Sequence, residues 1–178
     1  PKSTLLWVRA FSKIYNSKMA VDVLAELLKT YPDAELCMVG PDKDGSLKEF
    51  IQYAREKEVD THIKITGKLT REEWTKLSER YDFFINTTNI DNTPISVIEA
   101  MALGMYIVST NPGGIPYLLD GGKDSFLVIP GDYQAMANKI IQGLKNPLLM
   151  TSITEAARLK AENFDWHNIR TKWINLLN

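Results

Sequence analysis

The chain has 178 residues, of which 44% are hydrophobic and 24% charged, and its formal net charge is -1. This size and composition fit one globular domain with a full core and exclude a disordered or fibrous chain. Because Lys and Arg are scattered along the sequence and balanced by acidic residues, we expect no nucleic-acid partner. The sequence opens almost directly on a strand pattern without an initiator Met, so we expect a fragment of a longer protein.

The single cysteine and the lack of a long apolar stretch bear on the cellular setting. Cys37 lies within the apolar run Leu36–Val39, which predicts a buried thiol and not half of a disulfide. No apolar stretch reaches the roughly 18 residues that span a bilayer, and the amino terminus has no charged-then-apolar signal pattern. We therefore expect a cytoplasmic protein, and peripheral association with the inner face of a membrane stays open.

Short apolar runs alternate with helical patterns along most of the chain. We predict strands over Thr4–Val8, Glu35–Val39, His62–Thr66, Phe83–Asn86, Tyr106–Ser109 and Phe126–Ile129. Strands of this kind alternating with helices predict an α/β fold in which a parallel sheet is covered on both faces. The expected architecture is a Rossmann-like sheet of about six strands.

Helical spacing predicts helices over Ala20–Thr30 and Ser46–Lys57, the second capped by its first residue, and Thr70–Glu73 has the pattern of a capping box. After Ile129 we predict helices only, over Tyr133–Lys145, Leu148–Asn163 and, capped by Asp165, Trp166–Leu177. We expect this helical tail to fold back across the sheet. Residues 1–178 are thus predicted to form a single domain.

The most informative helix carries one carboxylate in an apolar run. Thr93 suits the N-cap and Pro94 the first helical position. Every residue of Ile95–Leu103 is apolar except Ser96 and Glu99, which are three apart and share one face. A helix this apolar is expected to be buried, so Glu99 needs a hydroxyl-rich or cationic partner unless it faces solvent. With the anion site at a helix N-terminus, this pattern predicts a nucleotide-like ligand whose ribose hydroxyls bind Glu99.

Loops after the strands are the expected ligand site, because open α/β sheets bind ligands at the carboxyl ends of their strands. Arg9 and Lys18 in the first loop are candidate diphosphate ligands, and Lys13 competes with Lys18. The pair Gly113–Gly114 either forms an ordinary turn or brings backbone amides close to a ligand. All the unusual loops are expected along one edge of the sheet: 9–18, 40–45, 67–69, 87–93 and 111–114.

Other functional classes lack their motifs. His62 and His167 are isolated, so we expect no metal site. The sequence contains neither GxGxxG nor a Walker P-loop, which disfavours classical dinucleotide binding and P-loop NTPase activity. The tryptophans form no stripe and are predicted to be core or helix-docking residues: Trp7, Trp74, Trp166 and Trp173.

A family resemblance follows from these motifs in combination. Glu99 to Gly104 reads Glu-Ala-Met-Ala-Leu-Gly, a strand and Gly113–Gly114 follow, and Asp91 precedes Glu99 with seven residues between them. In this pattern the whole chain resembles the carboxyl-terminal, donor-binding domain of retaining nucleotide-sugar glycosyltransferases. These enzymes have two facing Rossmann-like domains and form the GT-B glycosyl transferases group 1 family.

The resemblance implies a role for each matching position. Glu99 would bind the ribose, Arg9 and Lys18 would neutralise the diphosphate, and the loop at Gly67 would meet the base through backbone atoms. Asp91 stands where the family usually has a Glu that touches the donor sugar, and Asn92-Thr93-Pro94 replaces a Gly-Phe-Gly. The predicted catalytic residues are Arg9, Lys18 and Asp91, and the predicted donor-binding residues are Gly40, Gly67, Lys68, Leu69, Thr93, Ile95, Ser96 and Glu99.

The leading hypothesis is therefore the donor half of a retaining glycosyltransferase of polysaccharide or glycoconjugate biosynthesis, inactive as a fragment. Its donor is expected to be a nucleoside-diphosphate sugar, with UDP as the working choice, and no metal or other cofactor is expected. A glycan or lipid-linked acceptor would bind a missing amino-terminal domain, toward which residues 164–178 would pack. The alternative is a non-catalytic α/β nucleotide-binding or interaction module. A receiver-like signalling domain is disfavoured because Val8-Arg9-Ala10 lacks the acidic residues it needs.

Overall fold

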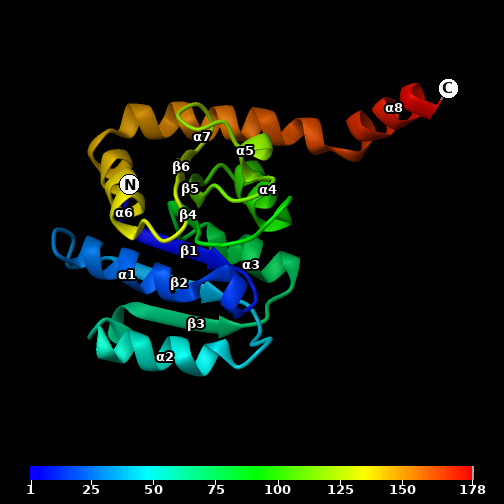
Figure 1. Ribbon diagram of the computed structural model, residues 1–178. Helices are drawn as coiled ribbons and strands as arrows, with labels where there is room; N and C mark the ends of the chain where they lie inside the picture. The colour runs from blue at the N-terminus through cyan, green and yellow to red at the C-terminus, as the bar shows by residue number, and fades with distance from the viewer. Residues whose placement is uncertain (178) are drawn as a thin grey trace.

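The protein is built on one parallel sheet. The computed structural model describes residues 1–177, and its six strands are all parallel, in the order β3-β2-β1-β4-β5-β6. β1 and β4 are neighbours, so the first half of the chain extends the sheet on one side and the second half on the other (Figure 1). The predicted Rossmann-like fold is confirmed. The strands are β1 (Thr4–Val8), β2 (Glu35–Val39), β3 (Ile63–Gly67), β4 (Phe83–Asn86), β5 (Tyr106–Thr110) and β6 (Phe126–Val128).

Helices cover both faces of the sheet because side chains alternate along each strand. On β1, Leu5 and Trp7 join a core cluster with residues of α1, α2 and α6, whereas Leu6 joins a second cluster with residues of α3, α4 and α7. The helices are α1 (Ser17–Leu28), α2 (Ser46–Glu56), α3 (Arg71–Ser78), α4 (Ile95–Ala102), α5 (Ile115–Leu118), α6 (Tyr133–Lys145), α7 (Pro147–Ala161) and α8 (Trp166–Leu177), with 3-10 turns η1 (Lys13–Tyr15), η2 (Asp60–His62) and η3 (Glu162–Phe164).

Several predicted element starts are shifted by local backbone geometry. α1 begins three residues before Ala20, because Asn16 adopts a left-handed conformation at φ 47° and turns the chain there. β3 begins one residue late because His62 belongs to the turn η2. The prediction of Ser46 as a cap is wrong: Gly45 occupies the cap position of α2, and the Ser46 hydroxyl donates to Asp44 instead. The capping box of α3 is confirmed.

The helical tail divides into two parts. α7 packs against α4 and β5, as the predicted fold-back requires. α8 instead extends away from the sheet (Figure 1) and buries none of its described residues, because η3 interrupts the helical path. The side chains of Trp166 and Trp173 are 70% and 55% exposed, so their prediction as core or docking residues is wrong within this chain. Packing of 164–178 on another domain stays a prediction, and Asn178 lies outside the described residues.

The burial predicted for the sheet is confirmed for its central strands, whereas the edge strand β3 has no fully buried residue. Cys37 is fully buried in β2, and Trp7 and Trp74 belong to the two core clusters. Trp7 also donates from Nε1 to Thr87 Oγ1 at 3.0 Å, which joins β1 to the loop after β4. Within residues 1–177, no helix combines the length and hydropathy that a membrane crossing needs.

The carboxyl ends of three strands meet at Gly40. Its φ is 149°, and a Cβ at this position would lie 1.8 Å from the carbonyl oxygen of Arg9 at the end of β1. The Gly40 amide donates to the carbonyl oxygen of Gly67, the last residue of β3, at 2.8 Å. Only glycine allows this approach, which brings the loops after β1, β2 and β3 together.

We predict that Gly40→Ala destabilises the protein by about 3 kcal/mol or more, because the new methyl group clashes with backbone that cannot move away. Gly45→Ala is the matched control: φ there is 84°, but nothing lies within 4 Å of the added Cβ. This control should lose only about 1 kcal/mol from the left-handed conformation. Urea unfolding measures both free energies, and equal losses would contradict the close approach.

Candidate functional site

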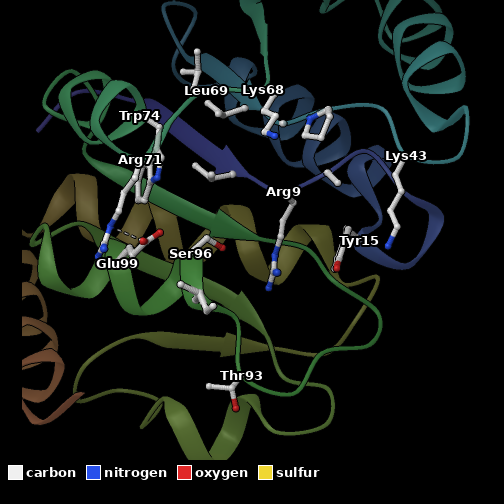
Figure 2. Close-up of a pocket in the computed structure, with 16 residues that line it drawn as sticks. Arg9, Tyr15, Lys43, Lys68, Leu69, Arg71, Trp74, Thr93, Ser96 and Glu99 are labelled. Carbon is white, nitrogen blue, oxygen red and sulfur yellow. Dashed lines mark ion pairs between the residues drawn. The ribbon is translucent and has the colours of Figure 1, made fainter. Parts of the chain in front are cut away.

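A cleft lies where the strand order reverses between β1 and β4. In open α/β sheets this position, at the carboxyl ends of the strands, is where ligands bind. The cleft has a volume of about 500 Å³ and is formed by the loops after β1, β2 and β3 together with the start of α4 (Figure 2). Eight of the predicted site residues line it: Arg9, Gly40, Lys68, Leu69, Thr93, Ile95, Ser96 and Glu99. The structure therefore brings most of the predicted set to one place.

The N-terminus of α4 forms one wall of the cleft. Pro94, not Thr93, is the cap residue, and its extended backbone at φ -69°, ψ 110° places the helix start at Ile95. The predicted cap was therefore one residue early. The first amides of a helix have no partner within the helix, and here those of Ile95 and Ser96 belong to cleft-lining residues. The Ser96 hydroxyl is buried without a hydrogen-bond partner, so this wall can donate to an anionic ligand.

Glu99 has a cationic partner, which was one of the alternatives that the sequence allowed. Arg71 Nε lies 2.9 Å from Glu99 Oε1, and the two side chains are 79% and 18% exposed (Figure 2). α4 is less buried than predicted: only Val97, Ala100 and Met101 are fully inside, and Ile95 is 69% exposed. Glu99 nevertheless faces the cleft, on the same side as Ser96.

Arg9 and Asp91 form a second ion pair deeper in the site. The Arg9 guanidinium donates to Asp91 Oδ2, and the side chains are 15% and 13% exposed. Burial lowers the pKa of Arg9, and the Asp91 carboxylate acts in the opposite direction. A guanidinium stays protonated at neutral pH, so the pair is ionic. Arg9 lines the cleft, whereas Asp91 is not among its lining residues. The central carbon of the guanidinium, Cζ, lies 4.9 Å from the centroid of the Tyr15 ring.

The Gly113–Gly114 turn holds the Asp91 loop in place. The Gly114 amide donates to the Asp91 carbonyl oxygen at 3.1 Å, and a Cβ on Gly113 would lie 2.1 Å from the same oxygen. A Cβ on Gly114 would lie 2.2 Å from the carbonyl oxygen of Asn92. The expectation that these amides approach a ligand is therefore wrong for Gly114, because its amide is used by the protein. The glycines are needed for packing of one loop on another.

Lys18 and Gly67 do not line the cleft. Lys18 pairs with Glu49 at 3.2 Å on the exposed surface between α1 and α2. Gly67, at φ 74°, turns the chain out of β3 and uses its carbonyl oxygen to accept from Gly40. The lysine that the structure does bring to the cleft from the second loop is Lys43. Because an exposed ion pair is weak, Lys18 is free to exchange Glu49 for another anion.

Comparison with known proteins assigns the chain to a family. The family model described as "Glycosyl transferases group 1" matches residues 1–160. The chain belongs to this family. Sulfoquinovosyl transferase SQD2 of Arabidopsis thaliana is 28% identical over 169 residues, covering 91% of this chain and 32% of the relative. N-acetyl-alpha-D-glucosaminyl L-malate synthase of Bacillus anthracis is 25% identical over 154 residues, covering 86% and 39%. This group 1 chain thus spans well under half the length of these relatives.

Solved structures agree on the fold. Anabaena HepE in complex with UDP has a TM-score of 0.89 at 22% identity over 99% of this chain and 48% of that one. The C-terminal domain of the group 1 family protein LpcC from Francisella tularensis has a TM-score of 0.80 at 19% identity, over 92% of this chain and 86% of that one. The fold is therefore that of the carboxyl-terminal domain of GT-B glycosyltransferases, as predicted.

Several cleft residues of this family member were missed from the sequence. Arg71 follows the capping residue of α3 directly, and Lys43 lies in the second loop, so both stood in segments already singled out. The signal for both is a cation in a segment that follows a strand, the same signal that pointed to Arg9 and Lys18. Tyr15 and Trp74 complete the wall as aromatic side chains. No group of three or more His, Cys, Asp or Glu suited to a metal ion occurs in the part of the chain that the structure describes.

Asp44 ties the first loop to the second at the rim of the site. Its carboxylate accepts from the Ser12 hydroxyl at 2.9 Å, from the Lys13 amide at 3.1 Å and from the amide and hydroxyl of Ser46. These hydrogen bonds, that of the Ser46 hydroxyl first, lower the pKa of Asp44 from 3.8 to about 2. Lys13, the predicted competitor of Lys18, thus contributes its backbone to this link.

We predict a loss of stability on acidification that depends on Asp44. Its folded-state pKa is lowered, so the stability it adds is present above its ordinary pKa of 3.8 and is lost as pH falls toward about 2. Asp44→Asn should lower the free energy of unfolding at neutral pH and weaken its pH dependence within that window. Urea unfolding at a series of pH values measures both. An unchanged slope in the variant would contradict the link between the loops.

Proposed function

We propose that this chain is the donor-binding half of a glycosyltransferase that takes a nucleoside-diphosphate sugar. The observation that carries the proposal is the set of groups in one cleft at the sheet's reversal point: the Glu99 carboxylate, the Arg9 guanidinium and the donor-rich N-terminus of α4. These groups match the three parts of such a ligand, since a carboxylate accepts from a diol and cations and helix amides bind phosphate. Membership of the group 1 family supports the same reading.

The proposed ligand is oriented by these groups. Glu99 takes the ribose hydroxyls, Arg9 with the amides of Ile95 and Ser96 takes the diphosphate, and the loop at Gly67 meets the base through its backbone. The donor sugar then lies toward Asp91. Because Asp91 is paired with Arg9, its contact with a sugar hydroxyl must share the carboxylate with the guanidinium. The structures of Anabaena HepE with UDP and with UDP-glucose support UDP as the first diphosphate to test.

The proposed chemistry is stabilisation of the leaving group. Negative charge develops on the nucleoside diphosphate as its bond to the sugar breaks, and fixed cations and helix amides stabilise it without reorganising. Arg9 is suited to this role because it keeps its charge while shielded from solvent. We assign the charge stabilisation to Arg9, Lys18 and α4 and assign no step to a metal ion. Retention of anomeric configuration at the donor sugar is part of the same proposal.

The acceptor belongs to the proposed whole protein. A glycan or lipid-linked acceptor would bind a second domain toward which α8 points. The setting that we propose is polysaccharide or glycoconjugate biosynthesis in the cytoplasm, peripheral to a membrane. Transfer of sugar from a UDP-sugar by the longer protein tests this. If that activity is absent, the non-catalytic binding module replaces the transferase as the better explanation. If the activity is present and Glu99→Ala leaves it intact, the assignment of Glu99 to the donor site is overturned.

We predict that UDP binds this chain and raises its melting temperature as the logarithm of UDP concentration, because the ligand binds the native state alone. Glu99→Gln should weaken binding by about tenfold, since a charged acceptor of two hydrogen bonds is lost. Glu72→Gln, an exposed acid in the first turn of α3, is the matched control and should bind as the wild type does. Calorimetry measures the Kd values. No response to any nucleoside diphosphate at millimolar concentration would rule out the site.

A second prediction tests whether Lys18, which pairs with Glu49 in the structure, binds the diphosphate when the ligand is present. If Lys18 leaves Glu49 to bind the diphosphate, Lys18→Met should weaken UDP binding by about threefold to tenfold. Glu49→Gln should strengthen binding by about twofold, because it removes the competing carboxylate of a weak surface pair. Both values come from the same titration. Equal Kd values in the wild type and both variants would exclude Lys18 from the site and leave cleft-lining cations, Arg9, Lys43 and Lys68 among them, to bind the diphosphate.

A further inference from the structure

Arg71 has no part in the function proposed above, yet it makes the one ion pair recorded for Glu99 among residues 1–177. It is the first residue of α3, and the capping box between Thr70 and Glu73 fixes the turn that carries it. Its side chain crosses from α3 to α4 and reaches the carboxylate at the cleft wall (Figure 2). The backbone at Arg71 is therefore firmly held, while the side chain itself is 79% exposed.

The geometry of the pair leaves Glu99 able to bind a ligand. Arg71 contacts one carboxylate oxygen, Oε1, through Nε, and does not clasp both oxygens as a bidentate pair does. Oε2 and the remaining lone pair of Oε1 stay available, because a carboxylate accepts about four hydrogen bonds. A ribose diol and the guanidinium thus fit on the same carboxylate at once.

The ion pair also restricts the conformations that the Glu99 side chain can adopt. The Glu99 side chain is 18% exposed on a helix whose neighbouring residues are apolar. A carboxylate in this position without a partner has several accessible rotamers. The Arg71 guanidinium, with Nε 2.9 Å from Glu99 Oε1, attracts the carboxylate and selects the rotamer that faces the cleft. An exposed pair adds little to the stability of the fold itself.

We infer that Arg71 is a positioning residue for ribose recognition: it holds the Glu99 carboxylate aimed into the cleft before the nucleotide arrives. This inference rests on the proposed function. The inference goes beyond the proposed function because it makes the affinity for the ribose depend on a residue of α3 as well as on Glu99 of α4. The diphosphate site at Arg9 is expected to be independent of Arg71.

The test compares two ligands. Titration of the chain with UDP, which has the ribose, and with pyrophosphate, which lacks it, gives a pair of Kd values for each variant. Arg71→Met should weaken UDP binding by about tenfold and leave pyrophosphate binding and the melting temperature unchanged. Arg71→Lys should restore part of the loss. Arg158→Met is the matched control. Arg158 is an exposed cation of α7 that lines a second groove together with Arg71 and Glu99, and no ion pair joins it to Glu99 among the described residues.

A double variant decides whether Arg71 acts through Glu99. If it does, Arg71→Met adds no further loss in the Glu99→Gln background, because the carboxylate that it positions is gone. The inference is overturned if Arg71→Met binds UDP as tightly as the wild type or more tightly, or if UDP and pyrophosphate weaken together. If either result is found while Glu99→Gln still weakens UDP binding as predicted, only the inference about Arg71 fails and the proposed function stands. Failure of the wild type to bind UDP overturns the proposed function instead.

Discussion

The ion pair between Arg9 and Asp91 is the interaction on which the arrangement of the site depends. Arg9 follows β1 and Asp91 precedes α4, so the pair joins the two halves of the sheet where the strand order reverses. It is shielded from solvent, and removing either partner would leave a buried charge that costs several kcal/mol, about 3 to 5 in known cases. The glycines at 113 and 114 hold the Asp91 loop from the other side. These contacts fix the loop that leads into α4, while the helix itself packs on α7 and β5.

Two acidic residues of the family pattern are each paired with an arginine, but with different consequences. Asp91 pairs with Arg9 and is shielded from solvent, whereas Glu99 pairs with Arg71 in the lining of the cleft and keeps one oxygen open. Burial and mutual attraction favour a fixed Asp91, while the exposed side chain of Arg71 leaves the Glu99 pair able to admit a further donor. One pair therefore organises the backbone of the site, and the other prepares a surface for a ligand.

The fold was largely predictable because each strand is a short apolar run bounded by turn residues, and each helix between them shows apolar residues at helical spacing. Three strands, Thr4–Val8, Glu35–Val39 and Phe83–Asn86, have the bounds predicted for them. The errors lie at element ends, where one backbone angle decides: the left-handed Asn16 sets the start of α1, and extended Pro94 sets the start of α4. The bounds of α8 are those predicted, and only the burial of Trp166 and Trp173 within this chain was wrong, because an amphipathic pattern indicates a buried face without indicating what covers it.

By itself the sequence determined the fold class, the edge of the sheet that carries the site and the family, because apolar periodicity and the Glu-Ala-Met-Ala-Leu-Gly pattern are local. It also placed Glu99 in the site, since one carboxylate in an apolar helix needs a partner. Only the tertiary structure decided which partners the charged residues take: Arg71 for Glu99, Arg9 for Asp91 and Glu49 for Lys18. The reason is physical. An ion pair between residues far apart in the chain depends on how strands and helices pack, and that distance is not encoded in local spacing.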